Sequence, residues 1–374
     1  MTEKQQRSKL SIVKKFIFGW IVAILVLVLF EFSLRFFQGP LAPDIQVHSM
    51  VGELDQWFVE EGAFVRPAYQ SYPNAFPKEK QKTRVAFFGA SSLNAGSPNV
   101  KKSEQFPELI GRNINVTTFN LAEPALDSHD ILKILEEVQK YKFDVWVIYT
   151  GHNDFGNTYF FQRYKGWSAK VEANLQQQLS QLRIYRLLQN VAKPSANSIS
   201  QGLRRDIYNQ REYAIGKDQR KVAQRLLFQN IERMKWLGES AGVEVLFVIP
   251  MAAIHKQPIG LCPHGAQVCG QRDYEIARKN YQRGETEQAM RMYEEAWLND
   301  SVPLRIPPDV QKDMRTMFTD KGYNFVDPQT QMPKEDNFDG PQFSLFHDHV
   351  HLSKQGHQEM ANLVEKQLQQ LMQE

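Results

Sequence analysis

Three apolar segments, each followed by a turn of small and polar residues, constrain the fold of this chain more than any other feature. Residues 84–88, 116–121 and 144–149 have the composition of buried strands, and residues 106–113 and 128–141 between them have helical periodicity. This alternation predicts an α/β fold with a doubly wound, mainly parallel sheet. The carboxyl ends of parallel strands meet at one edge, where open α/β sheets hold their sites, so we expect the turns to converge there.

The turns after the first and third segments carry side chains suited to chemistry. Ser91 and Ser92 follow the first segment, and His152, Asn153 and Asp154 follow the third. A serine at the carboxyl end of a strand can act as a nucleophile, but a serine in such a turn more often caps the next helix. The first turn by itself leaves both interpretations open.

A second polar cluster lies at residues 346–353, just before an amphipathic helix that we expect over residues 358–372. Asp348 and His351 are three residues apart, so their side chains can share one face of a turn. The carboxylate can then hold one imidazole nitrogen and leave the other free. An imidazole oriented in this way is a general base.

A zinc site made by His347, His349 and His351 is the alternative interpretation of the same cluster. Alternate residues on an extended segment would need further ligands, and the sequence has no distant cluster of histidine or cysteine to supply them. We therefore expect a base rather than a metal site, and no cofactor.

Composition narrows the classes of partner. The chain has 374 residues and a formal net charge of +3, enough material for one large domain or two smaller ones. Lysine and arginine are matched locally by glutamate and aspartate, without the basic stripe of a nucleic-acid-binding protein. We expect no nucleic-acid partner.

The apolar run at residues 16–37 is long enough to cross a bilayer. Five basic residues precede it: Lys4, Arg7, Lys9, Lys14 and Lys15. The positive-inside rule then places the N-terminus in the cytoplasm and the rest of the chain in the periplasm or outside the cell. We expect a single-pass anchor in the inner (plasma) membrane, with a cleaved signal peptide as the alternative.

The two cysteines, Cys262 and Cys269, enclose a short loop. In an oxidising compartment this spacing predicts a local disulfide, whereas in the cytosol it would indicate metal or redox chemistry. The exported location predicted above favours the disulfide.

Four blocks in order along the chain resemble those of the SGNH (GDSL-like) hydrolase superfamily. They are residues 89–91, 120–125, 151–154 and 348–351, and the resemblance extends over about residues 83–371. It implies a flavodoxin-like hydrolase fold with helical insertions and a serine nucleophile that attacks esters.

The resemblance also implies a role for individual residues. The nucleophile of the first block corresponds to Ser91, the base of the last block to His351, and the residue that orients this base to Asp348. The oxyanion-hole donors correspond to the backbone N–H groups of Ser91 and Ala125 and to the side chain of Asn153. Ser92 is a rival nucleophile, and only the block alignment favours Ser91.

The chain departs from the family pattern at two positions. Ala90 stands where the family often has aspartate, which is not the acid of the triad. Ala125 stands where the second block usually has glycine. Alanine keeps the N–H group but tolerates a positive φ poorly, so the departure bears on the oxyanion hole.

We expect a basic cytoplasmic tail at 1–15, a transmembrane anchor at 16–37, a stem that partly packs on the globular part at 38–82, and the hydrolase-like domain at 83–374. A helical insertion is expected at about 160–240. Residues 272–299 resemble one tetratricopeptide helical hairpin, as found in a bacterial branch of the superfamily. Such a hairpin could bind a protein partner, although packing on the core is the simpler interpretation.

The resemblance and the compartment together imply a membrane-anchored serine esterase or deacetylase acting on an O-acylated glycan, a lipid or a small ester. Transfer of an acyl group to a sugar hydroxyl of an envelope glycan would use the same residues. A scaffold in the cell envelope, without catalysis, is the alternative from another class of protein.

Overall fold

The computed structural model describes residues 3–38, 56–70, 74–80, 82–94, 99–161, 182–184, 217–260, 262, 269–332 and 345–373. The chain divides into two compact units, Met1–Gln46 with Tyr164–Asn197 and Val47–Arg163 with Ser198–Glu374. Of the expected helical insertion at about 160–240, the part before residue 217 lies outside the described residues, apart from residues 160–161 and 182–184.

The first unit is built on helix α1 (Glu3–Gln38). Its stretch Ile17–Phe37 has 21 residues with a mean hydropathy of 2.5, and its large apolar side chains are exposed. Arg35 Nε donates to Glu31 Oε1 at 3.0 Å one turn away, which pairs the two charges within the apolar stretch. By length and composition this helix can cross a membrane, and a signal sequence has the same properties.

The second unit contains the predicted parallel sheet. Its strands are β4 (Arg84–Gly89), β5 (Thr117–Asn120), β6 (Val145–Tyr149), β7 (Glu244–Val248) and β8 (Asn324–Val326). Among the described residues they form a five-stranded sheet in the order β5-β4-β6-β7-β8, and every neighbouring pair is parallel. The order reverses at β4, so the switch point lies between the carboxyl ends of β4 and β6. The predicted flavodoxin-like fold class is confirmed.

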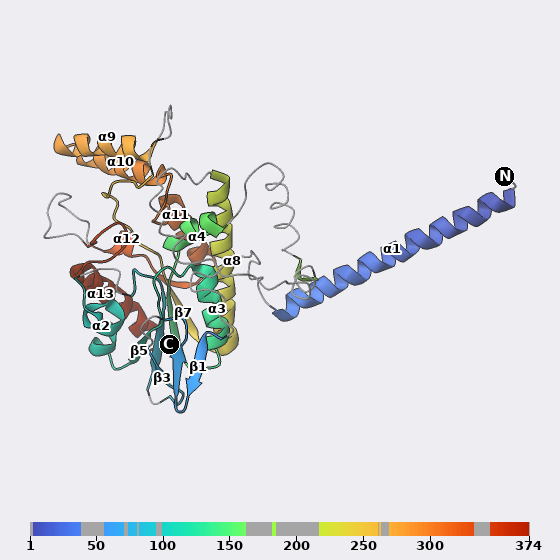
Figure 1. Ribbon diagram of the computed structural model, residues 1–374, viewed down its shortest axis with the longest axis horizontal. Helices are drawn as coiled ribbons and strands as arrows, with labels where there is room; N and C mark the ends of the chain where they lie inside the picture. The colour runs from blue at the N-terminus through green and yellow to red at the C-terminus, as the bar shows by residue number, and fades with distance from the viewer. Residues whose placement is uncertain are drawn as a thin grey trace. The chain divides into compact units, whose positions relative to one another are not determined.

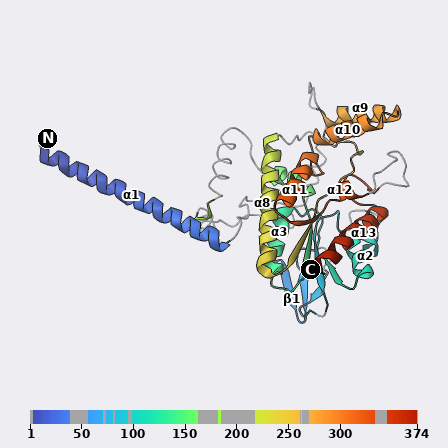
Figure 2. The same cartoon turned by 180° about the vertical axis from the view of Figure 1, so that it is seen from behind.

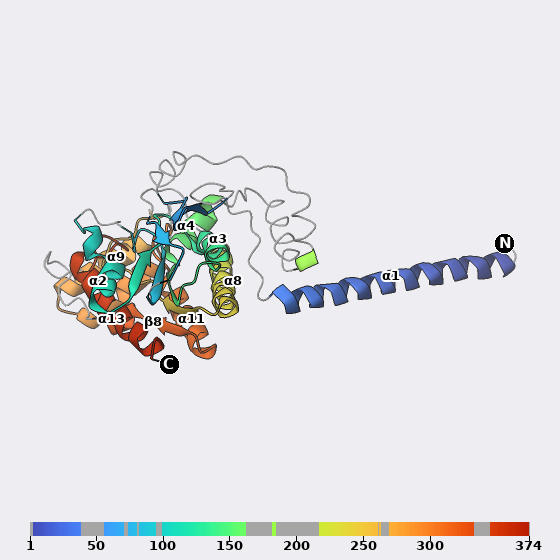
Figure 3. The ribbon, with the colours of Figure 1, turned by 90° about the horizontal axis from the view of Figure 1, so that it is seen from below.

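Helices cover both faces of this sheet. They are α2 (Phe106–Asn113) and α13 (Lys354–Leu371) on one face, and α3 (Ser128–Val138), α8 (Lys217–Ala241) and α11 (Pro308–Asp320) on the other (Figures 1 and 2). In the view from below, α2 and α13 lie on one side of the sheet, and α3 and α8 lie on the other side (Figure 3). Buried side chains alternate accordingly, with Val85 and Phe87 facing α2 and α13, and Phe247 stacked on Phe318 of α11 at 5.0 Å.

The shorter and peripheral elements are η1 (Lys102–Glu104), α4 (His152–Phe161), α9 (Gly270–Gln282), α10 (Thr286–Leu298) and α12 (Pro328–Gln331). Helices α9 and α10 lie side by side as a helical hairpin (Figure 1) and share a small core of Ala277, Ala289 and Tyr293. The likeness of this hairpin to a tetratricopeptide unit stays a prediction.

The C-terminal helix α13 begins four residues earlier than the sequence analysis placed it. The side-chain oxygen of Ser353 accepts from Gly356 N–H at 3.1 Å and caps the first turn at Lys354. Gly356 is required there, because a Cβ would lie 2.1 Å from the Leu345 carbonyl oxygen. The cap fixes the point at which the segment carrying Asp348 and His351 meets the helix.

The stem contains a small antiparallel sheet that the sequence analysis did not predict. Its strands are β1 (Phe58–Glu61), β2 (Phe64–Pro67) and β3 (Phe76–Pro77), in the order β1-β2-β3. Phe58 and Phe76 are buried, and Phe76 packs edge-on against Phe119 and Phe143 of the hydrolase-like domain. These three strands of the stem are therefore packed into the second unit.

Candidate active site

Ser91 lies in a helical turn that begins directly after β4. Leu93 N–H and Asn94 N–H both donate to the Ala90 carbonyl, at 3.0 and 3.1 Å. The first N–H groups of such a turn have no partner within it, which leaves the Ser91 N–H available to an acceptor. Gly89 allows the sharp entry, since a Cβ there would lie 2.7 Å from the Tyr149 carbonyl oxygen of the neighbouring strand.

The structure brings Ser91, His351 and Asp348 together across 260 residues of sequence. His351 Nε2 lies 2.8 Å from Ser91 Oγ, and His351 Nδ1 lies 2.6 Å from Asp348 Oδ2. Ser92, the rival nucleophile, is buried with 5% of its surface exposed, while Ser91 is half-buried. The contact to His351 thus distinguishes the two serines.

The segment that carries the histidine is fixed by its own aspartate. Asp348 Oδ1 accepts the backbone N–H groups of Val350 and His351, each at 2.9 Å. His347 N–H donates to the His351 carbonyl at 2.8 Å, within a bridge that pairs Phe346 with Leu352. The expected proximity of Asp348 and His351 follows from this closed turn, which lies before the helix.

Burial disfavours the charge on Asp348, but the hydrogen bonds from the His351 ring and from two backbone N–H groups outweigh it and hold the pKa of Asp348 well below its usual range. An ionised Asp348 can only accept, so the His351 Nδ1 carries a proton. In the neutral imidazole the Nε2 lone pair then faces the Ser91 hydroxyl. This arrangement can remove a proton from Ser91.

The loop that carries Ala125 forms a tight turn at residues 123–126. Leu126 N–H donates to the Glu123 carbonyl at 3.3 Å, and Ala125 has a φ of 78°, the one positive φ outside glycine among the described residues. Pro124 restricts its own φ to about −65°, so a left-handed residue after it gives a type II turn. In a type II turn the central peptide is rotated relative to a type I turn, so the Ala125 N–H takes the side that the Pro124 carbonyl would otherwise occupy.

Two asparagines of α4 hold the carbonyl groups of this turn. Asn153 Nδ2 donates to the Leu126 carbonyl at 2.9 Å, which leaves a second N–H of the same amide for another acceptor. Asn157 is fully buried, and its Nδ2 donates to the Ala125 carbonyl at 3.1 Å and to Asp127 Oδ2 at 2.8 Å. The sequence analysis identified Asn153 but missed Asn157, which lies one helical turn further along.

A buried network underneath the turn centres on Asp154. Its Oδ1 accepts from the backbone N–H of Ser128 at 3.2 Å and from the Ser128 hydroxyl, which in turn accepts from Asn230 Nδ2 at 2.8 Å. Burial and the nearby carboxylate of Asp127 raise the pKa of Asp154 to about 7. The sequence analysis assigned no role to Asp154, because its partners are on α3 and α8.

Two further histidines near the candidate site have structural contacts. His152 Nδ1 accepts from the Ile306 N–H at 3.2 Å, and burial lowers the pKa of His152 to about 3, so its ring is neutral. His349 Nε2 donates to the Gln257 carbonyl at 2.7 Å. Within the part of the chain that the structure describes, no group of three or more His, Cys, Asp and Glu side chains is arranged to hold a metal ion.

Cys262 and Cys269 form a disulfide with a Cα–Cα distance of 5.4 Å, as the sequence analysis predicted. Cys269 is the N-cap residue of α9, so the disulfide fixes the start of the helical hairpin.

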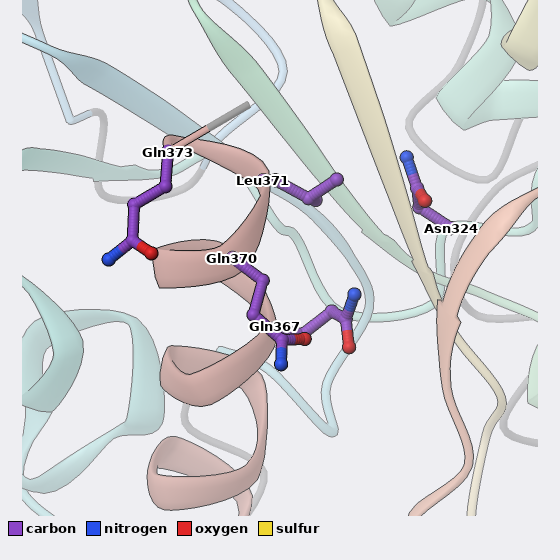
Figure 4. A pocket seen from close by; sticks show the side chains of 5 residues that line it. All are labelled: Asn324, Gln367, Gln370, Leu371 and Gln373. Carbon is purple, nitrogen blue, oxygen red and sulfur yellow. The ribbon is translucent and has the colours of Figure 1, made fainter.

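A pocket of about 420 Å³ lies at the other edge of the sheet, beside the amino end of β8 (Figure 4). Its lining is mostly side-chain amides, contributed by Asn324 and by Gln367, Gln370 and Gln373 near the end of α13. Parallel strands place Asn324 and Ser91 at opposite edges, so this pocket is separate from the candidate active site.

Comparisons with known proteins place the chain in a family. A search of curated proteins found no match. Similar solved structures include a lipolytic protein of the G-D-S-L family from Veillonella parvula, with 11% identity, 76% of this chain and 97% of that chain covered, and a TM-score of 0.39. A GDSL-like lipase from Bacteroides thetaiotaomicron has 14% identity, with 77% and 89% covered and a TM-score of 0.40.

A lipase/acylhydrolase from Enterococcus faecalis is similar at 15% identity, with 76% of this chain and 95% of that chain covered and a TM-score of 0.37. The family described as GDSL-like Lipase/Acylhydrolase matches residues 85–364, about three quarters of the sequence. This range contains Ser91, Asp348 and His351, and the predicted family is confirmed. The chain belongs to the GDSL-like lipase and acylhydrolase family of ester hydrolases.

Proposed function

We propose that this protein is a serine esterase in which Ser91 is the nucleophile, His351 the general base and Asp348 the residue that orients His351. The observation that carries the proposal is the continuous contact from Asp348 Oδ2 through His351 to Ser91 Oγ, with distances of 2.6 and 2.8 Å. Nucleophile, base and orienting group at hydrogen-bond distances are the requirement for covalent acyl transfer.

In the acylation step the Ser91 proton passes through His351 to the leaving alcohol, and the acyl group exchanges its bond to this alcohol for a bond to Ser91 Oγ. The Ser91 hydroxyl proton moves to His351 Nε2 while Ser91 Oγ forms a bond to the ester carbonyl carbon. The tetrahedral intermediate collapses with loss of the alcohol, which takes the proton from His351. Water repeats the sequence on the acyl-enzyme, so one ester and one water give one alcohol and one carboxylic acid.

The negative charge of the intermediate develops on the former carbonyl oxygen. The N–H groups of Ser91 and Ala125 and the second N–H of Asn153 are the donors that we assign to it. The type II turn at Ala125 and the second N–H of the Asn153 amide support this assignment. Donors fixed before the reaction stabilise the transition state without reorganisation.

For the substrate, we propose an O-acylated glycan, a lipid or a small ester, in keeping with the family and with a domain carried outside the inner membrane by α1. Acyl transfer to a sugar hydroxyl would share every step up to the acyl-enzyme. Release of free acetate from an acetylated substrate without an added acceptor would distinguish hydrolysis from obligate transfer.

Labelling with a fluorophosphonate serine probe tests the proposed nucleophile. The parent chain and Ser92→Ala should be labelled, and Ser91→Ala and His351→Ala should not. A folded parent that is not labelled, or labelling that is lost with Ser92→Ala and kept with Ser91→Ala, would refute the assignment. In the first case the role of an envelope scaffold would take its place.

A further inference from the structure

The stem contacts the same loop that carries Ala125. Tyr69 Oη donates to the Leu121 carbonyl at 2.8 Å, and Asn74 Nδ2 donates to the Asn120 carbonyl at 2.8 Å. Gln70 Nε2 donates to the carbonyls on both sides, Asn120 at 3.1 Å and Ala122 at 3.0 Å. Three consecutive carbonyl groups of the loop therefore bind stem side chains, immediately before the turn at residues 123–126.

Gln70 is the centre of this contact. Both of its amide protons are used on the loop, and its Oε1 accepts the backbone N–H of Asn74 at 2.9 Å. Only 5% of its surface is exposed, so water cannot replace these bonds without opening the structure. The Ala122 carbonyl also accepts Asn94 Nδ2 at 2.8 Å, from the helical turn that holds Ser91. One carbonyl thus joins the stem, the loop and the nucleophile turn.

The stem itself is anchored firmly enough to act as a support. Glu137 of α3 accepts the backbone N–H groups of Trp57 and Phe58 at 2.9 and 3.3 Å. At the far end of β4 the buried Arg84 guanidinium lies over the rings of Phe76 and Phe143, at 5.3 and 4.6 Å from their centres. These contacts tie β1 to α3 and β3 to the main sheet, on either side of Gln70 in the sequence.

A left-handed alanine needs such support. Ala125 is in a sparsely populated backbone region, and residues of this kind persist only where their surroundings determine the conformation. Relaxation to a type I turn would rotate the central peptide and replace the Ala125 N–H by the Pro124 carbonyl at the same place. Asn157 holds the turn from the α4 side, and the stem holds the chain that leads into it.

We propose that the stem is a positioning element of the active site, in which Gln70, assisted by Tyr69, holds the loop at residues 120–126 so that the Ala125 N–H faces the reacting carbonyl oxygen. This inference rests on the proposed function, because it assigns a role in transition-state stabilisation. The stem would then position a group of the active site as well as connect α1 to the sheet.

The test compares hydrolysis of p-nitrophenyl acetate by the full-length chain and by stem variants. Gln70→Ala and Gln70→Glu, which keeps the shape but lacks the donors, should lower kcat by about tenfold or more, since misplacing a catalytic group costs one to two orders of magnitude. KM should change by less than about twofold, because substrate binding is unaffected. Tyr69→Phe removes one hydroxyl and should show a smaller loss in the same direction.

Glu61→Gln is the matched control within the stem. It breaks the exposed pair between Arg66 Nε and Glu61 Oε1 at 2.8 Å without touching the loop, and it should keep the kcat of the parent. Ala125→Gly supplies a second readout that a general loss of stability would not give. Because glycine accepts the left-handed turn without strain, it should raise kcat more in Gln70→Ala than in the parent chain.

The outcomes separate the two proposals. A parent that shows no Ser91-dependent turnover and no fluorophosphonate labelling would overturn the proposed esterase and the positioning role with it. An active parent whose folded Gln70→Glu and Tyr69→Phe variants keep kcat within about twofold would overturn the positioning role alone. These two conservative variants decide the question even if Gln70→Ala does not fold.

Discussion

The two sides of the candidate active site are built in different ways. On the His351 side, the contacts are between side chains: His351 meets Asp348, three residues away, and Ser91, 260 residues away. On the Ala125 side, the functional group that we propose is a backbone N–H, and its direction depends on one left-handed residue in a turn. The first side depends on residue identity, and the second depends on conformation imposed by the surroundings.

This difference determines how each side should respond to substitution. Removing a side chain from the His351 side deletes a chemical step, so the loss is large and does not depend on the rest of the fold. A change near Ala125 alters the fraction of molecules with a correctly directed N–H. The losses of activity should therefore be smaller, and they should accompany changes in the stability of the loop. Substitutions on the two sides can therefore be ranked by the size of their expected effect on activity or stability.

The largest effect is expected for Ser91→Ala and His351→Ala. Each should lower kcat by on the order of 10⁵-fold, and the double variant should be no worse than either single variant, since the two residues act as one unit. Hydrolysis of p-nitrophenyl acetate measures this. His349→Ala, whose Nε2 donates to the Gln257 carbonyl rather than to Ser91, is the control and should keep most of its activity. If the loss of kcat in the double variant equalled the product of the two single losses, Ser91 and His351 would not act as one unit.

Asn153→Ala should have the next largest effect. Loss of one oxyanion donor lowers kcat by about a hundredfold, with KM nearly unchanged, because the donor acts on charge that develops only in the transition state. Asn153→Asp keeps the shape but replaces donors by a carboxylate, so its loss should be at least as large. Steady-state kinetics of both variants test this, and an Asn153→Asp enzyme as active as the parent would exclude an oxyanion role.

Much of the His351 side could be predicted from the sequence. The strands before Ser91 and Asn153 follow from apolar runs, and the pairing of Asp348 with His351 follows from their spacing in a tight turn. The choice between Ser91 and Ser92 required the block alignment, because neighbouring hydroxyls in a turn look alike before the fold places one of them 2.8 Å from His351 Nε2.

The Ala125 side could be predicted only in part. The turn predicted after residues 116–121 and the usual family glycine pointed to a turn at Ala125. The support from Asn157 and Asp154 of α4 and from Gln70 of the stem comes from separate parts of the chain, whose proximity no local pattern encodes. The stem strands were missed for the same reason. They are short, two of them contain proline, and their burial depends on rings and a guanidinium contributed by the main sheet.

Asp154→Asn would test how far the buried network determines stability on this side. The unfolded chain ionises this carboxyl near pH 4, but the folded chain ionises it near pH 7, so unfolding releases a proton between these values. The contribution of Asp154 to the free energy of unfolding should therefore fall as pH rises through this interval.

Asn does not titrate, so between about pH 5 and about pH 7 the change in the free energy of unfolding should be about 2 kcal/mol more negative for the parent than for Asp154→Asn. Urea unfolding at the two pH values measures this difference. Buried neutral histidines such as His152 change stability in the opposite direction, but their contribution is common to both proteins and cancels. Equal pH dependence in parent and variant would mean that Asp154 is ionised in the folded chain throughout.

The smallest effect, and the most direct test of the comparison, is the stability of Ala125→Gly. An alanine in the left-handed region costs about 1 kcal/mol, whereas glycine adopts it without strain but loses somewhat more entropy on folding. The net result should be an unchanged or slightly higher free energy of unfolding.

Ala122→Gly, a buried position in the same loop without a positive φ, should instead be destabilising by about 1 kcal/mol. Because the two substitutions are chemically identical and only three residues apart, opposite responses in urea unfolding would isolate the backbone conformation of residue 125. Equal destabilisation would mean that Ala125 is not left-handed in solution, and the N–H assigned to the oxyanion would lose its structural basis.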